Sequence, residues 1–288
     1  MNRIKFLQNS QSISGHARPM VVSILSGKGG VGKSVIALNL SERLSSLGHR
    51  TLLVDADSMC GNIHILANVQ AERGFQQFAG GSPLSQCECV LNSAWSIMAS
   101  GSNPSGTTGI DVSQAARVIE RLRQEAVQYD FVVIDHGSGV SNTSTVMAHG
   151  SDVNLLVLIP ELTSIADCYG LYKYLLTANG SIDCRLLVNR TVSEDEAEYV
   201  QSKFFTVTSR FLGRIPGYSG HLWETSLVRE SVARQMPMAG LEPEAPILQQ
   251  LTGIIGNLIG PAEVSTEDST GRLETRINER PETADTRG

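Results

Sequence analysis

The chain has 288 residues, of which 41% are hydrophobic and 18% are charged, and its formal net charge is −6. This composition is typical of a globular protein and excludes a wholly disordered chain. The acidic balance argues against a protein coated in nucleic acid, and no stretch reaches the roughly 18 uninterrupted apolar residues that a membrane span needs. The five cysteines form no CxxC pair, and the first residues lack a signal-peptide core, so we expect a reduced, cytoplasmic protein.

The chain begins with a polar segment, residues 1–20, which predicts a flexible N-terminal tail. From residue 21 to residue 260, short apolar runs alternate with longer amphipathic segments. Near-continuous apolar runs suit strands that are buried on both faces of a parallel sheet. The predicted strands are Val21–Leu25, Thr51–Asp55, Trp95–Ala99, Phe131–Asp135, Val153–Ile159, Cys184–Asn189 and Phe211–Ile215.

Amphipathic segments between these runs predict helices. The predicted helices are Ser34–Leu47, Val112–Val127, Ser164–Ala178, Glu194–Thr208 and His221–Gln235, with a last one over 247–259. Strand followed by helix, repeated, predicts a doubly wound α/β domain with a mostly parallel sheet. After residue 260 apolar residues become scarce, which predicts a disordered C-terminal tail over 261–288.

A glycine-rich loop follows the first predicted strand. Gly27, Gly32, Lys33 and Ser34 satisfy the pattern G-x-x-x-x-G-K-[ST], so the domain is predicted to be a single P-loop NTPase domain. Glycines let backbone N–H groups turn toward a phosphate, and the following helix adds the positive end of its dipole. Lys33 is expected to reach the β- and γ-phosphates, and Ser34 to ligate Mg²⁺. The nucleotide-binding residues predicted in this loop are Gly27, Gly29, Gly30, Val31, Gly32, Lys33 and Ser34.

Three aspartates stand at or just beyond the ends of predicted strands. Asp55 and Asp57 are spaced i, i+2, so both are expected to point to the same side of the carboxyl edge of the sheet. Asp135 ends another apolar run. An isolated aspartate at a strand end is usually a helix cap, but three beside a phosphate loop are better explained by a nucleotide site. We therefore predict that Asp55 and Asp135 hold Mg²⁺ together with Ser34.

The segment KGGVGKS, beginning at Lys28, resembles the signature-lysine phosphate loop of the MinD/ParA family of ATPases. In that family the early lysine reaches across a dimer interface to the other subunit's phosphates, so the resemblance implies an ATP-dependent homodimer that uses Lys28. The segment DADSMCGN is similar to the family motif DxDxGxxN, which implies that Asp57 orients the hydrolytic water. Met59 replaces the usual Gly, and His136 stands where Thr or Ser is common. The predicted catalytic residues are Lys28, Lys33 and Asp57.

Two further residues are assigned to the base by the same resemblance. The family reads adenine with an Asn after the strand that Asn189 ends here, which implies ATP rather than GTP. Ile215-Pro216 resembles the segment that borders the base on its other side. Asn189 and Pro216 are therefore predicted to bind the nucleotide.

Residues 157–175 resemble the PExTSxxDAYxLxK segment of flagellar-number regulators of the FlhG/FleN type. The resemblance implies a switch ATPase that regulates the number or placement of flagella, or the position of another cell structure. Its expected partners are a second copy and a protein such as a flagellar SRP-type GTPase or a transcription regulator. The N-terminal DQAxxLR element and the basic membrane-targeting tail of that subgroup are not evident. No autonomous membrane anchor is therefore expected, and partners would recruit the protein to a membrane or pole.

Two other functions stay open. A partition ATPase that binds DNA would need a dense Lys/Arg patch, and the acidic chain shows no strong DNA-binding signal. A nucleotide-locked scaffold would bind ATP without turnover. Asp57 argues against the scaffold, while Met59 and His136 leave it open.

Overall fold

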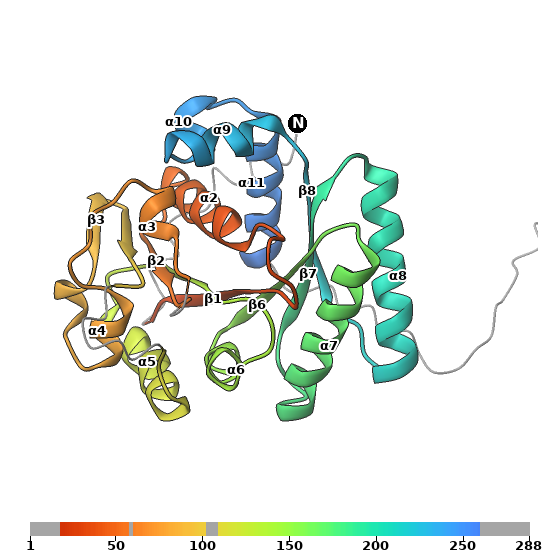
Figure 1. The fold of residues 1–288 in the computed structure, drawn as a ribbon, viewed down its shortest axis with the longest axis horizontal. Coiled ribbons are helices and arrows are strands. Elements are labelled where there is room, and N and C mark those ends of the chain that lie inside the picture. Colours follow the sequence, from red (N-terminus) through yellow and green to blue (C-terminus); the bar gives the residue numbers. More distant parts are fainter. Residues whose placement is uncertain (1–17, 58–59, 102–108, 260–288) are drawn as a thin grey trace, which may run out of the picture.

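The structure, a computed structural model, describes residues 18–57, 60–101 and 109–259. These residues form one central sheet between two layers of helices (Figure 1). Most of the two predicted tails, residues 1–17 and 260–288, lies outside the described part. No helix within the described ranges is long and apolar enough to cross a membrane.

The described residues form an eight-stranded sheet in the order β3-β4-β2-β5-β1-β6-β7-β8. Every neighbouring pair is parallel except β3 and β4, which are antiparallel. β1 lies inside the sheet, where the chain order changes direction, and α/β sheets bind ligands at such a point. The strands are β1 Met20–Leu25, β2 Thr51–Asp55, β3 Cys89–Asn92, β4 Trp95–Met98, β5 Phe131–Asp135, β6 Val153–Leu158, β7 Cys184–Thr191 and β8 Gly217–Trp223.

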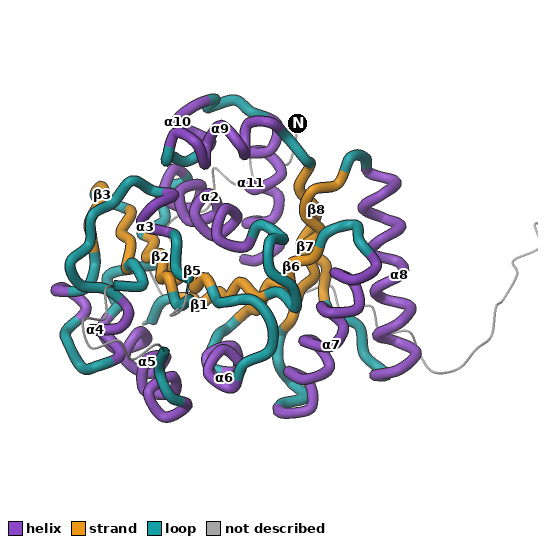
Figure 2. Tube along the Cα trace, in the orientation of Figure 1, coloured by secondary structure: helices purple, strands orange, loops and turns teal. Residues whose placement is uncertain are grey.

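Two helical layers cover the sheet (Figures 1 and 2). The layer that contains α2 and α11 packs on one face, and the layer from α4 to α8 packs on the other. The helices are α2 Lys33–Ser46, α3 Ile63–Leu66, α4 Phe75–Ala79, the 3₁₀ turn η1 Leu84–Gln86, α5 Val112–Glu125, α6 Asn142–His149, α7 Leu162–Ala178, α8 Glu194–Leu212, α9 Ser226–Arg234, α10 Met238–Leu241 and α11 Pro246–Ile259.

Burial on both faces explains the apolar runs of the central strands. In β1, Val22 and Ile24 pack with α2 and α11, while Val21 packs toward α5, and all three are fully buried. This is the pattern of a parallel sheet covered on both sides. The predicted doubly wound α/β fold with a mostly parallel sheet is confirmed.

One predicted strand is wrong. Over Phe211–Ile215, α8 continues to Leu212 and ends at Gly213, which adopts a left-handed conformation with φ of 64°. The last strand is instead Gly217–Trp223. Because β8 is an edge strand with a partner on one side only, its sequence GYSGHLW lacks the continuous apolar run on which the prediction depended.

The predicted helix His221–Gln235 is wrong in its first part. His221 belongs to β8, and the helix runs from Ser226 to Arg234. The Thr225 side chain accepts a hydrogen bond from the Leu227 N–H, which fixes the start of α9 after the strand. Several short elements carried no prediction: the edge strand β3, the helices α3, α4, α6 and α10, and the 3₁₀ turn η1.

Candidate nucleotide site

The glycine-rich loop joins β1 to α2 at the carboxyl edge of the sheet. Gly30 and Gly32 have φ values of +78° and +97°, a region that favours glycine. Gly32 is the N-cap of α2, and no side chain caps the first N–H groups of this helix. These N–H groups are donors that an anion can satisfy, and the helix dipole favours negative charge at the same place.

The loop is packed closely against its neighbours. A Cβ on Gly27 would lie 2.2 Å from the backbone of Asp167 in α7, so only glycine fits there. A Cβ on Gly32 would lie 2.5 Å from Asn189 Nδ2. The Asn189 amide also donates to the Val31 carbonyl at 2.7 Å. The backbone of the loop is therefore held by α7 on one side and by the end of β7 on the other.

Lys33 is almost enclosed, with 8% of its surface exposed. Burial lowers the pKa of Lys33, and the nearby Asp135 and Asp57 carboxylates act in the opposite direction. The structure thus brings together the cation and two of the acids that the sequence assigns to one site. An enclosed ammonium group beside the open N-terminus of a helix suits a phosphate ligand.

Asp55 and Asp135 end adjacent strands and stand opposite each other in the register of β2 and β5. Burial raises the pKa of Asp55 to about 8, and the Asp135 charge adds to this effect. The Asp55 carboxylate accepts the N–H groups of Asp57 at 3.2 Å and Ile63 at 3.1 Å, so it holds the start of the loop after β2. Whether Asp55 also faces a metal ion stays a prediction.

Burial also raises the pKa of Asp135 to about 7, against a hydrogen bond from Ser34 and the charge of Lys33. Asp135 Oδ1 is buried and has no hydrogen-bond partner among the described residues. An orphaned carboxylate oxygen next to a serine hydroxyl fits a hard cation such as Mg²⁺. The described residues contain no group of three or more His, Cys, Asp or Glu able to hold a metal.

Asp57 lies just beyond β2, and its Oδ1 accepts the Cys60 N–H at 3.0 Å. Gly137, in the loop after β5, approaches it closely: a Cβ there would lie 3.4 Å from Asp57 Oδ1. The predicted water-orienting residue therefore borders the loop that follows Asp135. No sequence pattern indicated this contact, because it joins two loops that are 80 positions apart.

His136, the first residue of that loop, is buried at 2% exposure, and burial lowers its pKa to about 3. The imidazole is therefore neutral at physiological pH. Its hydrogen-bond partner lies in β1 rather than in the phosphate loop. His136 Nε2 is 2.8 Å from Ser23 Oγ.

Lys28 extends from the phosphate loop to the start of α7. Its Nζ donates to Glu161 at 2.6 Å and to Thr163 at 3.2 Å. The side chains of both ion-pair partners are partly exposed, at 37% and 52%. Glu161 lies in the segment PELTS that carried the resemblance, but no sequence pattern indicated that it pairs with Lys28.

A small apolar cavity of about 250 Å³ opens beside the phosphate loop. Asn189, near the end of β7, lines it, as do Gly30 and Gly32 of the loop. The end of β8 and the turn after it form part of its wall, with Leu222, Trp223, Glu224 and Thr225, and residues of α2, α9, α10 and α11 also line it. This pocket is apolar with a few polar groups, which suits a planar base.

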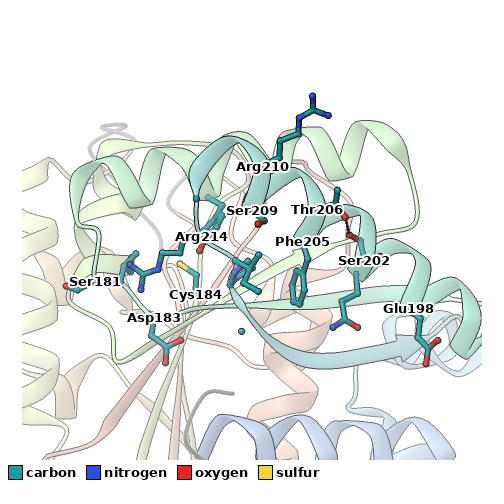
Figure 3. A pocket seen from close by; sticks show the side chains of 17 residues that line it. Ser181, Asp183, Cys184, Glu198, Ser202, Phe205, Thr206, Ser209, Arg210 and Arg214 are labelled. Carbon is teal, nitrogen blue, oxygen red and sulfur yellow. Dashed lines mark hydrogen bonds between the residues drawn. The ribbon is translucent and has the colours of Figure 1, made fainter. Parts of the chain in front are cut away.

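Pro216 does not line this pocket, and its contact with the base stays a prediction. It precedes β8, whereas Asn189 is level with Leu222 near the far end of that strand. At about 3.3 Å per residue, the two positions are separated by most of the length of β8. Pro216 instead lines a separate hollow of about 1040 Å³ between the second half of α8 and the starts of β7 and β8 (Figure 3).

Comparison with known proteins agrees with this geometry. The family model of the CobQ/CobB/MinD/ParA nucleotide binding domain matches residues 22–238. The antiactivator FleN of Pseudomonas aeruginosa is 29% identical over 216 residues, which are 75% of this chain and 77% of FleN. The flagellum site-determining protein YlxH of Helicobacter pylori is 24% identical over 261 residues, 88% of this chain and 84% of YlxH.

Solved structures share the fold. The septum site-determining protein MinD from Pyrococcus horikoshii, complexed with Mg-ADP, has a TM-score of 0.70 at 21% identity. The similarity covers 84% of this chain and 96% of that protein. A ParA family ATPase from Chlorobium tepidum has a TM-score of 0.69 at 17% identity and is covered completely, against 85% of this chain. The chain therefore belongs to the CobQ/CobB/MinD/ParA nucleotide-binding family and resembles the flagellar regulators FleN and YlxH within it.

Proposed function

We propose that the protein is an ATP-hydrolysing switch that forms a homodimer when it binds Mg-ATP and separates after hydrolysis. One observation carries the proposal. The orphaned oxygen of Asp135 lies beside the Ser34 hydroxyl and near the enclosed Lys33, at the end of a helix whose first N–H groups have no cap. Without a ligand, buried polar groups that lack partners lower the free energy of unfolding, and a bound phosphate with its cation would offset this cost.

Different residues have different roles in the proposed phosphoryl transfer. The loop N–H groups and Lys33 bind the phosphates, and Ser34 and Asp135, with Asp55, would hold Mg²⁺. When bound, the ion neutralises charge that develops on the phosphates. Asp57, which faces the loop after β5, orients the attacking water.

Lys28 supplies the link between nucleotide and dimer. In this structure it is paired with Glu161 and Thr163 of its own chain. An exposed ion pair of this kind contributes little to stability, so the multiply charged phosphates of ATP on a second copy can compete for the lysine. The dimer would then depend on ATP because the additional phosphate supplies the competing charge.

We further propose that the switch regulates the number or placement of flagella. The support is the similarity to an antiactivator and to a flagellum site-determining protein, over three quarters or more of both. A partner protein would recognise the ATP-bound dimer, and recruitment to a pole or membrane would follow from that partner. Counting flagella per cell after disruption of the gene in the source organism tests this part separately.

The biochemical test measures phosphate release and molar mass by light scattering, with Mg-ATP and with Mg-ADP. We expect turnover with ATP, twice the monomer mass with ATP, and monomer mass with ADP. Dimerisation with ATP but no turnover would favour the locked scaffold instead. A protein that neither dimerises nor hydrolyses ATP would contradict the switch.

A further inference from the structure

The loop after β5 touches three parts of the nucleotide site. A Cβ on Gly137 would lie 3.4 Å from Asp57 Oδ1, and a Cβ on Gly29 would lie 3.4 Å from Ser138 Oγ, so each pair is closely spaced. The Gly139 N–H donates to the Ser26 carbonyl at 2.9 Å. The position of residues 137–139 therefore affects both Asp57 and the phosphate loop.

This loop begins at a buried chain of hydrogen bonds. His136 Nε2 lies 2.8 Å from Ser23 Oγ in β1, and Ser23 Oγ lies 2.8 Å from Ser151 Oγ. Ser151 donates its hydroxyl hydrogen to the Met147 carbonyl of α6 at 2.9 Å. The chain thus connects the loop to the central strand and to α6, the helix that follows the loop.

The direction of the chain follows from counting hydrogens. A serine hydroxyl has one hydrogen, and that of Ser151 is used on the Met147 carbonyl. Ser23 must therefore donate to Ser151, which leaves Ser23 only its lone pairs for His136. The imidazole must donate from Nε2, so the neutral tautomer with hydrogen on Nε2 is the one that fits.

Burial of His136 and Ser23 makes this hydrogen-bond chain costly to break. His136 and Ser23 are almost completely buried, at 2% and 0% exposure. If His136 moved, the buried polar groups would lose their partners, which is costly in an apolar interior. The backbone is held as well, because the His136 N–H donates to the Ile24 carbonyl at 3.2 Å. Both the side chain and the backbone of His136 therefore fix where the loop starts.

We infer that His136 is a positioning residue for ATP hydrolysis: its hydrogen-bond chain to Ser23 and Ser151 holds residues 137–139 where they support Asp57 and the phosphate loop. This inference rests on the proposed function, since it concerns the hydrolytic step. Binding of ATP depends mainly on the loop N–H groups and Lys33, so it should not need His136.

The test compares two substitutions in the full-length chain. His136→Leu removes the donor, whereas His136→Gln can place an amide N–H near the position of Nε2. For His136→Leu we expect kcat to fall roughly 10- to 100-fold, as for a displaced catalytic group, with ATP affinity changed by no more than about twofold. His136→Gln should recover most of kcat. Ser219→Ala serves as the matched control and should keep kcat, because Ser219 is a buried serine of β8 whose Oγ has no hydrogen-bond partner among the described residues.

Hydrogen exchange of the nucleotide-free protein provides a second readout. The Gly139 amide should exchange faster in His136→Leu than in the wild type, while amides of β8 should not change. Unchanged kcat and unchanged Gly139 exchange in a folded His136→Leu protein would overturn the inference. It would also be overturned if the kcat of His136→Gln were as low as that of His136→Leu. If the wild type shows no turnover, the proposed function fails, and the exchange of Gly139 alone then decides the role of His136.

Discussion

The Asp135 carboxyl group is buried, and burial disfavours its charged form. Burial raises its pKa to about 7 from 3.8, and its Oδ1 has no hydrogen-bond partner in the described part of the chain. The folded protein therefore holds a proton more tightly than the unfolded chain does. The sign follows: the free energy of unfolding falls as the pH rises from about 4 to about 7. Without nucleotide, Asp135 therefore contributes less to the free energy of unfolding at pH 8 than at pH 5.

Asp135→Asn should remove this pH-dependent cost. Without nucleotide, we expect the variant to be more stable than the wild type at pH 8 by about 1–3 kcal/mol, and to gain much less at pH 5. Thermal unfolding at both pH values measures the difference. The same variant should lose Mg²⁺-dependent turnover. A variant destabilised equally at both pH values would show that Asp135 is not a strained charge.

Lys33 is the other residue whose burial indicates a ligand. Lys33→Ala should weaken ATP binding by about 100-fold or more, because hydrogen bonds to charged groups contribute about 1.5–3 kcal/mol each and the loop offers no other enclosed ammonium group in the described residues. Calorimetry with Mg-ATP measures the loss. Lys203→Ala, which removes an exposed lysine stacked on Tyr199 in α8, is the control and should bind ATP normally. Near-normal affinity in Lys33→Ala would contradict the phosphate-loop assignment.

At the scale of elements, the sequence predicted the central strands well and the edge of the sheet poorly. β1, β2 and β5 are buried on both faces, so their apolar runs mark their position and length. β8 has a partner on one side only and contains Gly217 and Gly220, so no run marks it. The error then spread to the next element: the predicted strand ended at Ile215, before β8 begins, and residues 221–223 of β8 were assigned to the following helix.

The candidate site shows the same division. The phosphate loop, Asp55, Asp57, Asp135 and Asn189 lie at or near the ends of strands that were predicted correctly, and the structure gathers them at one edge. Pro216 was assigned through the resemblance of Ile215-Pro216 to a family segment, and it precedes β8. The contacts of Glu161, His136 and Gly137 join segments far apart in the chain, which no local pattern indicates.

One packing contact tests how the last helix is held. Arg185 in β7, 5% exposed, donates to the carbonyls of Asn257 and Leu258 at the end of α11 and pairs with Asp183 at 2.7 Å. These carbonyls are acceptors that the helix itself leaves open, and a cation there also favours the helix dipole. Arg185 therefore fixes the end of α11 that lies away from the nucleotide pocket, which Ile247 and Leu251 line.

Arg185→Met should lower the free energy of unfolding by about 2–4 kcal/mol, because it leaves buried carbonyls without donors. ATP affinity should be unchanged. Arg234→Met, which breaks the exposed pair with Glu230 at 2.8 Å, should change stability by no more than about 0.5 kcal/mol. Denaturant unfolding and calorimetry check both expectations. A loss of ATP affinity in Arg185→Met would mean that the far end of α11 shapes the pocket.

At the scale of the whole molecule, the proposed switch has two outputs, hydrolysis and association, which we assign to different residues. Asp57 borders the loop after β5. Lys28, in the phosphate loop, lies against the start of α7, where it is partly exposed. One residue can therefore control hydrolysis while the other controls association, although both belong to the same nucleotide site.

This separation leads to the last prediction, which compares Asp57→Ala with Lys28→Ala. Asp57→Ala should bind ATP, lose turnover by roughly 10²-fold or more because a positioned polar group is removed, and accumulate as a dimer. Lys28→Ala should bind ATP through Lys33 but remain monomeric, since two ATP-loaded loops would face each other with too little positive charge between them. It should also hydrolyse ATP poorly.

Light scattering with Mg-ATP and phosphate release, measured on both variants, distinguish these outcomes. Lys173→Ala, a substitution in α7 outside the Lys28 contacts, is the control for a lost surface charge and should dimerise as the wild type does. A Lys28→Ala protein that dimerises normally would show that this lysine serves only its ion pair with Glu161, and the dimer would then need another source of ATP dependence. An Asp57→Ala protein that keeps its turnover would move the water-orienting role to another residue of the loops after β2 and β5.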